Sequence, residues 1–377
     1  MRVLRSILRY LRKRRFSYSP LIEVFIHKDA LLDNLRYFQR LDPAVSVAPV
    51  LKSNAYGHGL VEVARVLDDQ SLPFFCVDSY YEALILRNED IRTPILILGY
   101  TPLENIGAEL ADVAYSIVSI DALHALARSA RENVRVHLKI DTGMHRHGIL
   151  EDEIDDALAL LRANRRVRLE GVYTHLADAD AKDSAHALKQ KALWNDIVDR
   201  VKDVFPDVKY IHASATAGTW VGMEANCMRL GLGLYGVHGG GERHELRPAL
   251  EMRSSISSVR TVRAGESIGY NATFTAPEEM RIATIPAGYY EGIDRRLSSV
   301  GFVEIRGKPC AIRGRVSMNI TSVDVSALQN VVAGEDVVIY SADPASPASI
   351  ESASRTCGTI PYELLVHIPG TLRRTVV

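Results

Sequence analysis

Cysteine is scarce in this 377-residue chain, and the four that occur lie far apart, at Cys76, Cys227, Cys310 and Cys357. Their spacing fits neither the disulfide framework of a small secreted domain nor the paired cysteines of a zinc site. We therefore expect free thiols and a reducing compartment, the cytoplasm.

The chain also lacks a strong charge of one sign and a long apolar run. Its formal net charge is −1, so bulk electrostatics give no argument for binding nucleic acid. No apolar stretch reaches the length that a membrane-spanning helix needs. Apolar residues make up 47% and charged residues 24% of the chain, as is typical of a globular protein. The length of 377 residues is suited to two domains.

Residues 1–20 differ from the rest because positive charge gathers there. Seven arginines and lysines precede the first acidic residue, Glu23. The apolar residues fall at helical spacing on one face, at Val3, Leu4, Ile7, Leu8 and Leu11. Such a basic amphipathic extension can lie weakly on an anionic membrane surface. The favoured alternative is that it packs on the remainder of the protein or forms a loose tail, since most amphipathic helices face a protein core.

Between residues 45 and 236, short apolar runs alternate with helical patterns. Eight runs read as strands, at residues 45–51, 74–77, 95–98, 114–118, 134–140, 169–174, 210–213 and 228–232. They are mostly continuous rather than alternating, as expected for parallel strands buried on both faces. Eight β/α alternations in about 200 residues predict a TIM (β/α)8 barrel, which we place at residues 21–240.

The pattern changes after Gly236. A glycine-rich break is followed by short β-type runs punctuated by glycine and proline, at residues 254–262, 280–285, 300–305, 310–316 and 335–340. Few long helical patterns occur among them. Residues 241–377 are therefore predicted to form a separate, mainly antiparallel β domain.

The first barrel strand ends in a lysine. Residues 45–51 are largely apolar, Lys52 follows, and residues 53–59 are polar and contain two glycines. Lysine is rarely buried, since desolvation disfavours its charged form. A lysine at the end of a buried strand is thus a candidate for the neutral amine that forms Schiff bases. Taken alone, the same lysine could instead extend into solvent.

Residues 52–59, Lys-Ser-Asn-Ala-Tyr-Gly-His-Gly, resemble the cofactor-lysine motif of the alanine racemases. These are barrel-type enzymes that depend on pyridoxal 5′-phosphate (PLP). The resemblance extends over nearly the whole chain, because the family also has a barrel followed by a β domain. It implies that Lys52 carries the cofactor and serves as one catalytic base, and that Tyr56 donates a hydrogen bond to the cofactor phosphate.

An arginine lies in the last barrel strand, within Met-Arg-Leu-Gly-Leu-Gly-Leu-Tyr-Gly at residues 228–236. An arginine in so apolar a strand must find polar partners, because leaving it unpaired is costly. The segment resembles a family motif, which implies that Arg229 faces the pyridine nitrogen and that Gly231 and Leu232 hold the phosphate. Arginine keeps its proton, so it would donate a hydrogen bond without protonating the ring.

Further cofactor contacts follow from the resemblance. His175, at the end of the sixth strand, would lie between Arg229 and a catalytic tyrosine. Thr216 would donate its hydroxyl to the phosphate, although Ala215 stands where the family usually has asparagine.

Residues 139–148 resemble the family's Lys-x-Asp-Thr-Gly-Met-x-Arg-x-Gly motif. Arg146 would then meet the substrate carboxylate. Lys139 matches a lysine that is carbamylated in some members and braces that arginine. An unmodified, charged Lys139 would repel Arg146.

The β domain carries the remaining matches to the family. Tyr270 would be the second catalytic base, which requires neighbours that stabilise its phenolate. Tyr289 would line the substrate entrance and the Met318 backbone N–H would meet the substrate carboxylate, while Tyr362 would touch the phosphate. Two positions depart from the family motifs, since Glu291 and Asn319 each replace an aspartate.

These observations together predict a PLP-dependent racemase that interconverts L- and D-alanine with a base on each face of Cα. The resemblance also implies a head-to-tail homodimer in which Tyr270 of one chain enters the barrel mouth of the other. A racemase of another small amino acid, such as serine, is one alternative. A non-catalytic PLP-binding protein is another, although such carriers lack a β domain. Decarboxylases of this architecture have a cysteine-centred motif that does not occur here.

Overall fold

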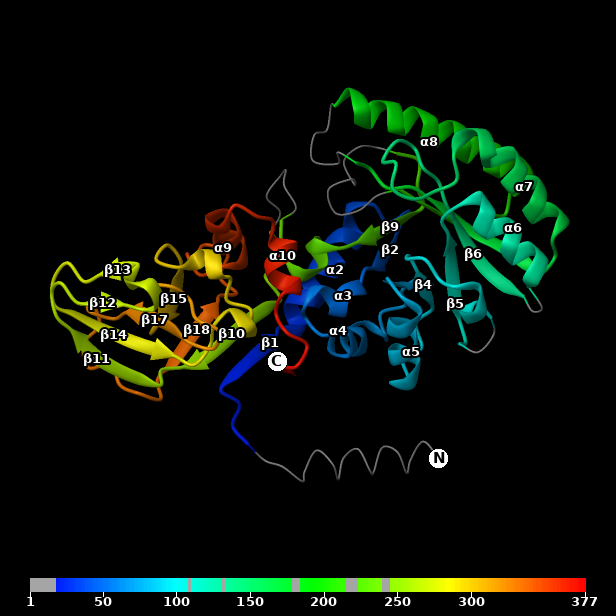
Figure 1. The fold of residues 1–377 in the computed structure, drawn as a ribbon. Helices are drawn as coiled ribbons and strands as arrows, with labels where there is room; N and C mark the ends of the chain where they lie inside the picture. The colour runs from blue at the N-terminus through cyan, green and yellow to red at the C-terminus, as the bar shows by residue number, and fades with distance from the viewer. Residues whose placement is uncertain (1–17, 108–109, 131–132, 178–183, 214–222, 239–244) are drawn as a thin grey trace.

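The computed structural model describes residues 18–107, 110–130, 133–177, 184–213, 223–238 and 245–377. It has two parts, a barrel with surrounding helices and a domain built of β-sheets (Figure 1). Most of the basic N-terminal segment lies outside the described residues, as do Ala215 and Thr216. In the part of the chain that is described, no helix is both long and apolar enough to cross a membrane.

All eight predicted barrel strands form. They are β2 (Ser46–Pro49), β3 (Phe75–Val77), β4 (Ile95–Ile97), β5 (Val113–Ile117), β6 (Val134–Lys139), β7 (Val167–Tyr173), β8 (Tyr210–His212) and β9 (Cys227–Leu230). Strands β3 to β8 pair in sequence order and all in parallel, and β2 pairs in parallel with β9.

Two links close the circle between these two sheets. A parallel bridge joins Val50 to Cys76, and the Asn226 N–H donates to the Ile211 carbonyl at 3.0 Å. The barrel prediction is confirmed. The strands sit where continuous apolar runs occur because the barrel buries both of their faces.

Helices cover the outside of the barrel, and serine begins several of them. The covering helices are α2 (Lys28–Leu41), α4 (Leu60–Leu67), α5 (Tyr80–Asn88), α6 (Ile120–Ser129), α7 (Ile154–Ala163) and α8 (Ala185–Val204), and the short element α3 (Lys52–Tyr56) follows β2. Ser79, Ser119 and Ser184 each accept a hydrogen bond from a backbone N–H of the first helical turn. Such caps satisfy donors that have no partner within the helix.

The β domain consists mainly of antiparallel strands, as predicted. Its strands are β1 (Ile22–Ile26), β10 (Leu250–Ser255), β11 (Ser258–Val262), β12 (Ser267–Ile268), β13 (Phe274–Thr275), β14 (Met280–Ile285), β15 (Phe302–Ile305), β16 (Lys308–Ala311), β17 (Thr321–Asp324), β18 (Asp336–Tyr340) and β19 (Arg373–Val376). The largest sheet has the order β16-β15-β18-β10-β1-β19. Helices α9 (Ile350–Cys357) and α10 (Pro361–Val366) come shortly before β19.

The first strand belongs to this second domain. β1 lies between β10, with which it is antiparallel, and β19, with which it is parallel. The sequence-based boundaries assigned these residues to the barrel. The strand alternates buried and partly exposed residues, which is the pattern of a sheet with one covered face rather than of a barrel strand.

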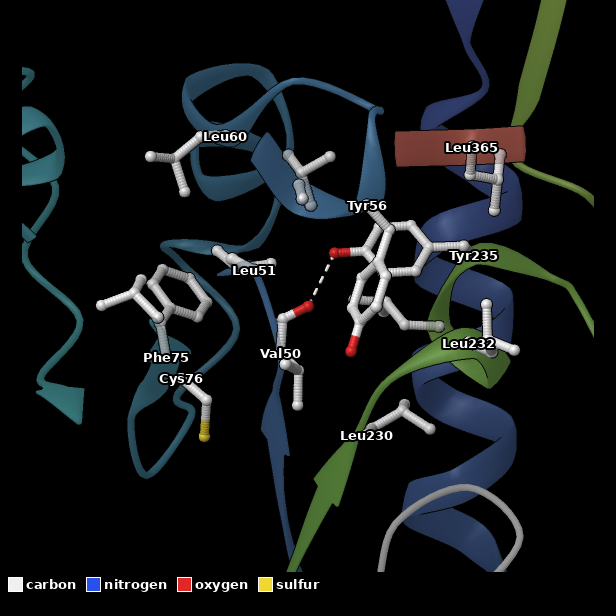
Figure 2. Close-up of a cluster of buried hydrophobic side chains, with 14 of the residues drawn as sticks. Val50, Leu51, Tyr56, Leu60, Phe75, Cys76, Leu230, Leu232, Tyr235 and Leu365 are labelled. Atoms are coloured by element: carbon white, nitrogen blue, oxygen red, sulfur yellow. Dashed lines mark hydrogen bonds between the residues drawn. The ribbon is translucent and has the colours of Figure 1, made fainter. Parts of the chain in front are cut away.

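One continuous hydrophobic core extends through both domains. All four cysteines lie buried as free thiols. Figure 2 shows the part of the core at the ends of β2 and β9, where Val50, Leu230 and Leu232 pack around Tyr235. The Tyr235 hydroxyl donates to the Val50 carbonyl at 2.7 Å (Figure 2). This buried bond ties the segment after β9 to the end of the strand that precedes Lys52.

Replacing Tyr235 by phenylalanine removes this hydroxyl and leaves the buried Val50 carbonyl without that donor. We expect Tyr235→Phe to lower the free energy of unfolding by about 1–3 kcal/mol, measured by urea denaturation. Tyr81→Phe is the matched control, because Tyr81 is well exposed and its change should stay within about 0.5 kcal/mol. Equal effects of the two substitutions would contradict a stabilising role for the Tyr235–Val50 bond.

Candidate active site

Lys52 opens a strained turn at the carboxyl end of β2. The four following residues, Ser53 to Tyr56, all have positive φ angles between 49° and 57°, so α3 is a left-handed turn. Each L-residue in this region costs roughly 1–2 kcal/mol. Strain of this kind persists only where the surroundings impose it, and it is concentrated at functional sites. The turn leaves Lys52 half-buried at the mouth of the barrel.

Contacts from both domains hold the turn in place. The Glu82 carboxylate on α5 accepts from the Asn54 backbone N–H at 3.3 Å. Arg374 on β19 donates to the Gly57 carbonyl at 2.8 Å. Gly57 has φ +81°, and a Cβ there would lie 2.0 Å from the Leu365 carbonyl of α10. The turn therefore depends on close packing against the β domain as well as on the barrel.

Three tyrosines gather beside the turn. The ring of Tyr56 lies 5.4 Å from that of Tyr362 and 5.3 Å from that of Tyr235. Burial, together with the neighbouring Tyr362, raises the pKa of Tyr56 well above its usual value. Tyr56 therefore keeps its phenolic proton and can donate a hydrogen bond to an anion. The predicted phosphate ligands Tyr56 and Tyr362 are thus brought together, and Leu232 lies beside Tyr235 (Figure 2).

Arg229, on β9, is a buried arginine with 4% exposure. Its guanidinium donates to the His212 carbonyl at 2.6 Å, to His212 Nδ1 at 2.8 Å and to the Thr174 carbonyl at 2.7 Å. The Tyr173 ring lies 5.1 Å from its central carbon. Among the described residues, its hydrogen-bond partners are carbonyl oxygens and histidine nitrogens, with no carboxylate. Its positive charge is therefore left uncompensated inside the barrel.

A pair of histidines extends from Arg229 into the barrel. His212 Nε2 lies 2.8 Å from His137 Nδ1, and His137 Nε2 faces a carboxylate oxygen of Glu170 at 3.7 Å. Burial lowers the pKa of both histidines, so both are neutral. Because His212 Nδ1 accepts from Arg229, its hydrogen must be on Nε2, which then donates to His137. The hydrogen of His137 is consequently on Nε2 and points towards Glu170.

Sequence reasoning did not assign His212 or His137 to the site. One pattern in the sequence could have indicated His137. Side chains two residues apart on a strand share a face, so His137 lies on the same face of β6 as Lys139. A lone histidine in an apolar strand is otherwise read as an ordinary core residue.

Positive charge is concentrated at the mouth. Lys139 is buried with 7% exposure, and burial together with Arg146 and Arg229 lowers its pKa to about 8. Burial and the surrounding cations Arg229, Arg146, Lys139 and Lys52 lower the pKa of His175 to about 3. His175 is therefore neutral at ordinary pH and can act as a hydrogen-bonding group. Such a concentration of positive charge fits an anionic ligand that carries a phosphate or carboxylate.

Of the candidate residues in the β domain, Tyr362 lies at this mouth, whereas Tyr270 lies apart from it. Tyr270 is 68% exposed on a short turn between β12 and β13, at the far end of the molecule from the barrel (Figure 1). Tyr289 and Met318 lie close to each other, since the Tyr290 N–H donates to the Met318 carbonyl at 2.9 Å. One chain therefore brings together Lys52, Tyr56, Lys139, His175, Arg229 and Tyr362, but does not bring Tyr270 to Lys52.

Comparison with known proteins identifies the family. The family profile "Alanine racemase, N-terminal domain" matches residues 26–239, and "Alanine racemase, C-terminal domain" matches residues 249–376. The chain belongs to the alanine racemase family. Alanine racemase from Sorangium cellulosum (strain So ce56) is 36% identical over 340 residues, which cover 86% of this chain and 90% of that protein. Alanine racemase from Desulfosudis oleivorans is 32% identical and covers 93% and 95% respectively.

Solved structures of the alanine racemase family share the fold. The enzyme from D-cycloserine-producing Streptomyces lavendulae superposes with a TM-score of 0.88 at 29% identity, covering 96% of this chain and 98% of that one. The Bacillus anthracis enzyme with bound L-Ala-P gives a TM-score of 0.87 at 29% identity and covers 96% of both chains. The similarity therefore includes both domains.

The lowered pKa of Lys139 leads to a prediction about its modification. Only a neutral amine adds carbon dioxide, and the neutral fraction of Lys139 rises as the pH passes through about 8. Carbamylation replaces a cation beside Arg146 with an anion, which turns repulsion into attraction. We expect a carbamate carbon resonance in 13C-bicarbonate that grows between about pH 7 and pH 9.

The resonance should be absent in Lys139→Arg, which keeps the positive charge but cannot be modified in this way. The exposed Lys189 provides the control, and Lys189→Arg should retain the full signal. A carbamate signal that persists in Lys139→Arg would place the modification on another lysine.

Proposed function

We propose that this protein is a PLP-dependent racemase that interconverts L- and D-alanine. The proposal rests mainly on Arg229, which is buried and has no carboxylate partner among the described residues. It lies at a positively charged barrel mouth together with the strained Lys52 turn. An anionic cofactor with a ring nitrogen that accepts a hydrogen bond fits this arrangement. The names of the relatives and the lengths over which they match support the same activity.

The residues at the mouth match the parts of PLP. The amine of Lys52 would hold the cofactor aldehyde, and the Arg229 guanidinium would donate to the ring nitrogen. Tyr56, Tyr362 and the backbone at residues 231–232 would hold the phosphate, together with Thr216. When bound, PLP supplies an electron-accepting ring that acidifies the Cα hydrogen of the amino acid.

The remaining roles belong to the chain's own side chains. Arg146 and the Met318 N–H would orient the substrate carboxylate, and Tyr289 would line the entrance. Lys52 would move the Cα proton on one face and Tyr270 on the opposite face. His212 and His137, both neutral, keep Arg229 fixed as a donor. Because arginine keeps its proton, the ring nitrogen receives a hydrogen bond rather than a full charge.

The position of Tyr270 supports a homodimer with shared sites. Within one chain Tyr270 follows β12 at the end of the β domain that lies away from α3, the turn that begins with Lys52 (Figure 1). A second copy arranged head to tail would bring the Tyr270 of each chain to the mouth of the other. The four buried thiols are consistent with our proposal of a cytoplasmic location.

The test of the function has two parts. Purified protein incubated with a panel of L-amino acids should give D-alanine faster than any other D-isomer, as resolved by chiral chromatography. Borohydride should fix PLP on the peptide that contains Lys52, and Lys52→Ala should abolish both labelling and turnover. D-serine as the main product would favour a serine racemase, and labelling without turnover would favour a non-catalytic PLP-binding protein.

If two bases act on opposite faces of Cα, removing one of them should affect the two enantiomers of alanine unequally. Tyr270→Phe removes the phenol but keeps the ring, so racemisation should fall by several orders of magnitude, since positioned acid–base groups each contribute about 10²–10⁴-fold. By analogy with the family, Lys52 should still exchange the Cα hydrogen of D-alanine in deuterated water. Exchange from L-alanine should be nearly lost. Equal exchange from both enantiomers would mean that a single base serves both faces.

A mixing experiment tests whether Tyr270 acts across subunits. Lys52→Ala and Tyr270→Phe are each expected to be inactive alone. If a site combines Lys52 of one chain with Tyr270 of another, subunit exchange between the two variants creates mixed dimers with one intact site. Roughly a quarter of wild-type activity should then return, on statistical mixing of equal amounts. No recovery after verified exchange would place both residues of a site in one chain.

A further inference from the structure

A buried carboxylate joins two loops of the β domain. Glu291 is 9% exposed, and its two carboxylate oxygens have different partners. One accepts from the Asn319 side-chain amide at 2.6 Å, and the other accepts from the Gly288 backbone N–H at 2.8 Å. Asn319 belongs to the loop between β16 and β17, whereas Gly288 and Glu291 belong to the turn after β14.

The backbones of the two loops are also bonded to each other. The Tyr289 N–H donates to the Ser317 carbonyl at 3.0 Å, and the Tyr290 N–H donates to the Met318 carbonyl at 2.9 Å. A Cβ on Gly288 would lie only 2.1 Å from the Ser317 carbonyl oxygen. The two loops therefore meet without space for adjustment, and the Glu291–Asn319 contact fixes their register.

This contact is close in sequence to two solvent-facing side chains. Tyr289 is 43% exposed and lies two residues before Glu291, and Met318 is 55% exposed and directly precedes Asn319, which is itself exposed. A shift of the pair would therefore displace Tyr289 and the Met318 backbone relative to each other. Both Tyr289 and the Met318 N–H would still be present after such a shift, but at a different spacing.

We propose that Glu291 and Asn319 form a positioning pair that sets the spacing between Tyr289 and the Met318 N–H for the substrate carboxylate. This inference rests on the proposed function. The amide matters because it donates a hydrogen bond without needing a proton, so the pair carries a single negative charge. In the family motifs both positions are aspartates, whereas here the longer Glu291 reaches the side chain of residue 319 directly. Opposite Glu291, a second carboxylate at residue 319 would either take up a proton or repel both Glu291 and the incoming substrate anion.

The experiment converts the amide into a carboxylate. In Asn319→Asp the two carboxyl groups face each other at hydrogen-bonding distance, so one shared proton can preserve the bond at low pH. As the pH rises the proton is lost and the loops separate. We expect the KM for L-alanine to rise about tenfold or more between pH 6 and pH 8.5 relative to wild type, with kcat nearly unchanged.

A double variant restores one amide and one carboxylate, with their positions exchanged. In Glu291→Gln combined with Asn319→Asp, the glutamine oxygen can accept from the Gly288 N–H while its amide donates to the new aspartate. This variant again carries one negative charge, and its KM should return to within about twofold of wild type at both pH values. A KM for Asn319→Asp that follows the wild-type pH profile, or a double variant that shows no recovery, overturns the proposal.

An unfolding measurement separates this inference from the proposed function. The urea midpoint of Asn319→Asp should fall from pH 6 to pH 8.5 by more than that of wild type and of the double variant, whatever the protein catalyses. If the urea midpoint of Asn319→Asp changes with pH as the midpoint of wild type does, Glu291 and Asn319 do not form the proposed pair. A wild-type protein inactive on every amino acid overturns the proposed function and, with it, the substrate role of the pair.

Discussion

The burial of Arg229, which has no carboxylate partner in the part of the chain that the structure describes, is the constraint around which the barrel interior is built. A guanidinium taken out of water must be solvated by the protein, and here carbonyl groups at the ends of β7 and β8 and the ring of His212 supply that solvation. The carbonyls face the arginine only because both strands end at the same rim. His137 in turn fixes the hydrogen on His212. The uncompensated charge is then available to an anionic ligand.

The strained turn at Lys52 makes the two domains mutually dependent. Four L-residues in the left-handed region are unfavourable in isolation, and the contacts that oppose this cost come partly from the barrel and partly from α10 and β19. The β domain therefore helps to hold the Lys52 turn in place, in addition to containing the distant Tyr270.

Sequence patterns predicted what local periodicity and motif order can encode. The eight barrel strands were recognisable because strands buried on both faces are continuously apolar, and Lys52, Tyr56 and Arg229 stand in extended motifs. The pairing of β1 with β10 and β19 was not recognisable, because a five-residue strand gives no information about partners more than 200 residues away. The His212–His137 pair was missed since each histidine is isolated in sequence. The contact between Glu291 and Asn319 likewise arises only when two loops meet.

The position of β1 has a consequence for how the chain folds as it is synthesised. The sheet that receives residues 22–26 is completed only by residues 373–376, which follow far later in the chain. Arg374, which bonds to the Gly57 carbonyl, lies in that final strand. A nascent chain can thus assemble most of its barrel early, yet the lysine turn acquires this support only after residue 374 has been made. A chain that stopped before residue 373 would keep every group of the barrel mouth and still lack a properly held lysine.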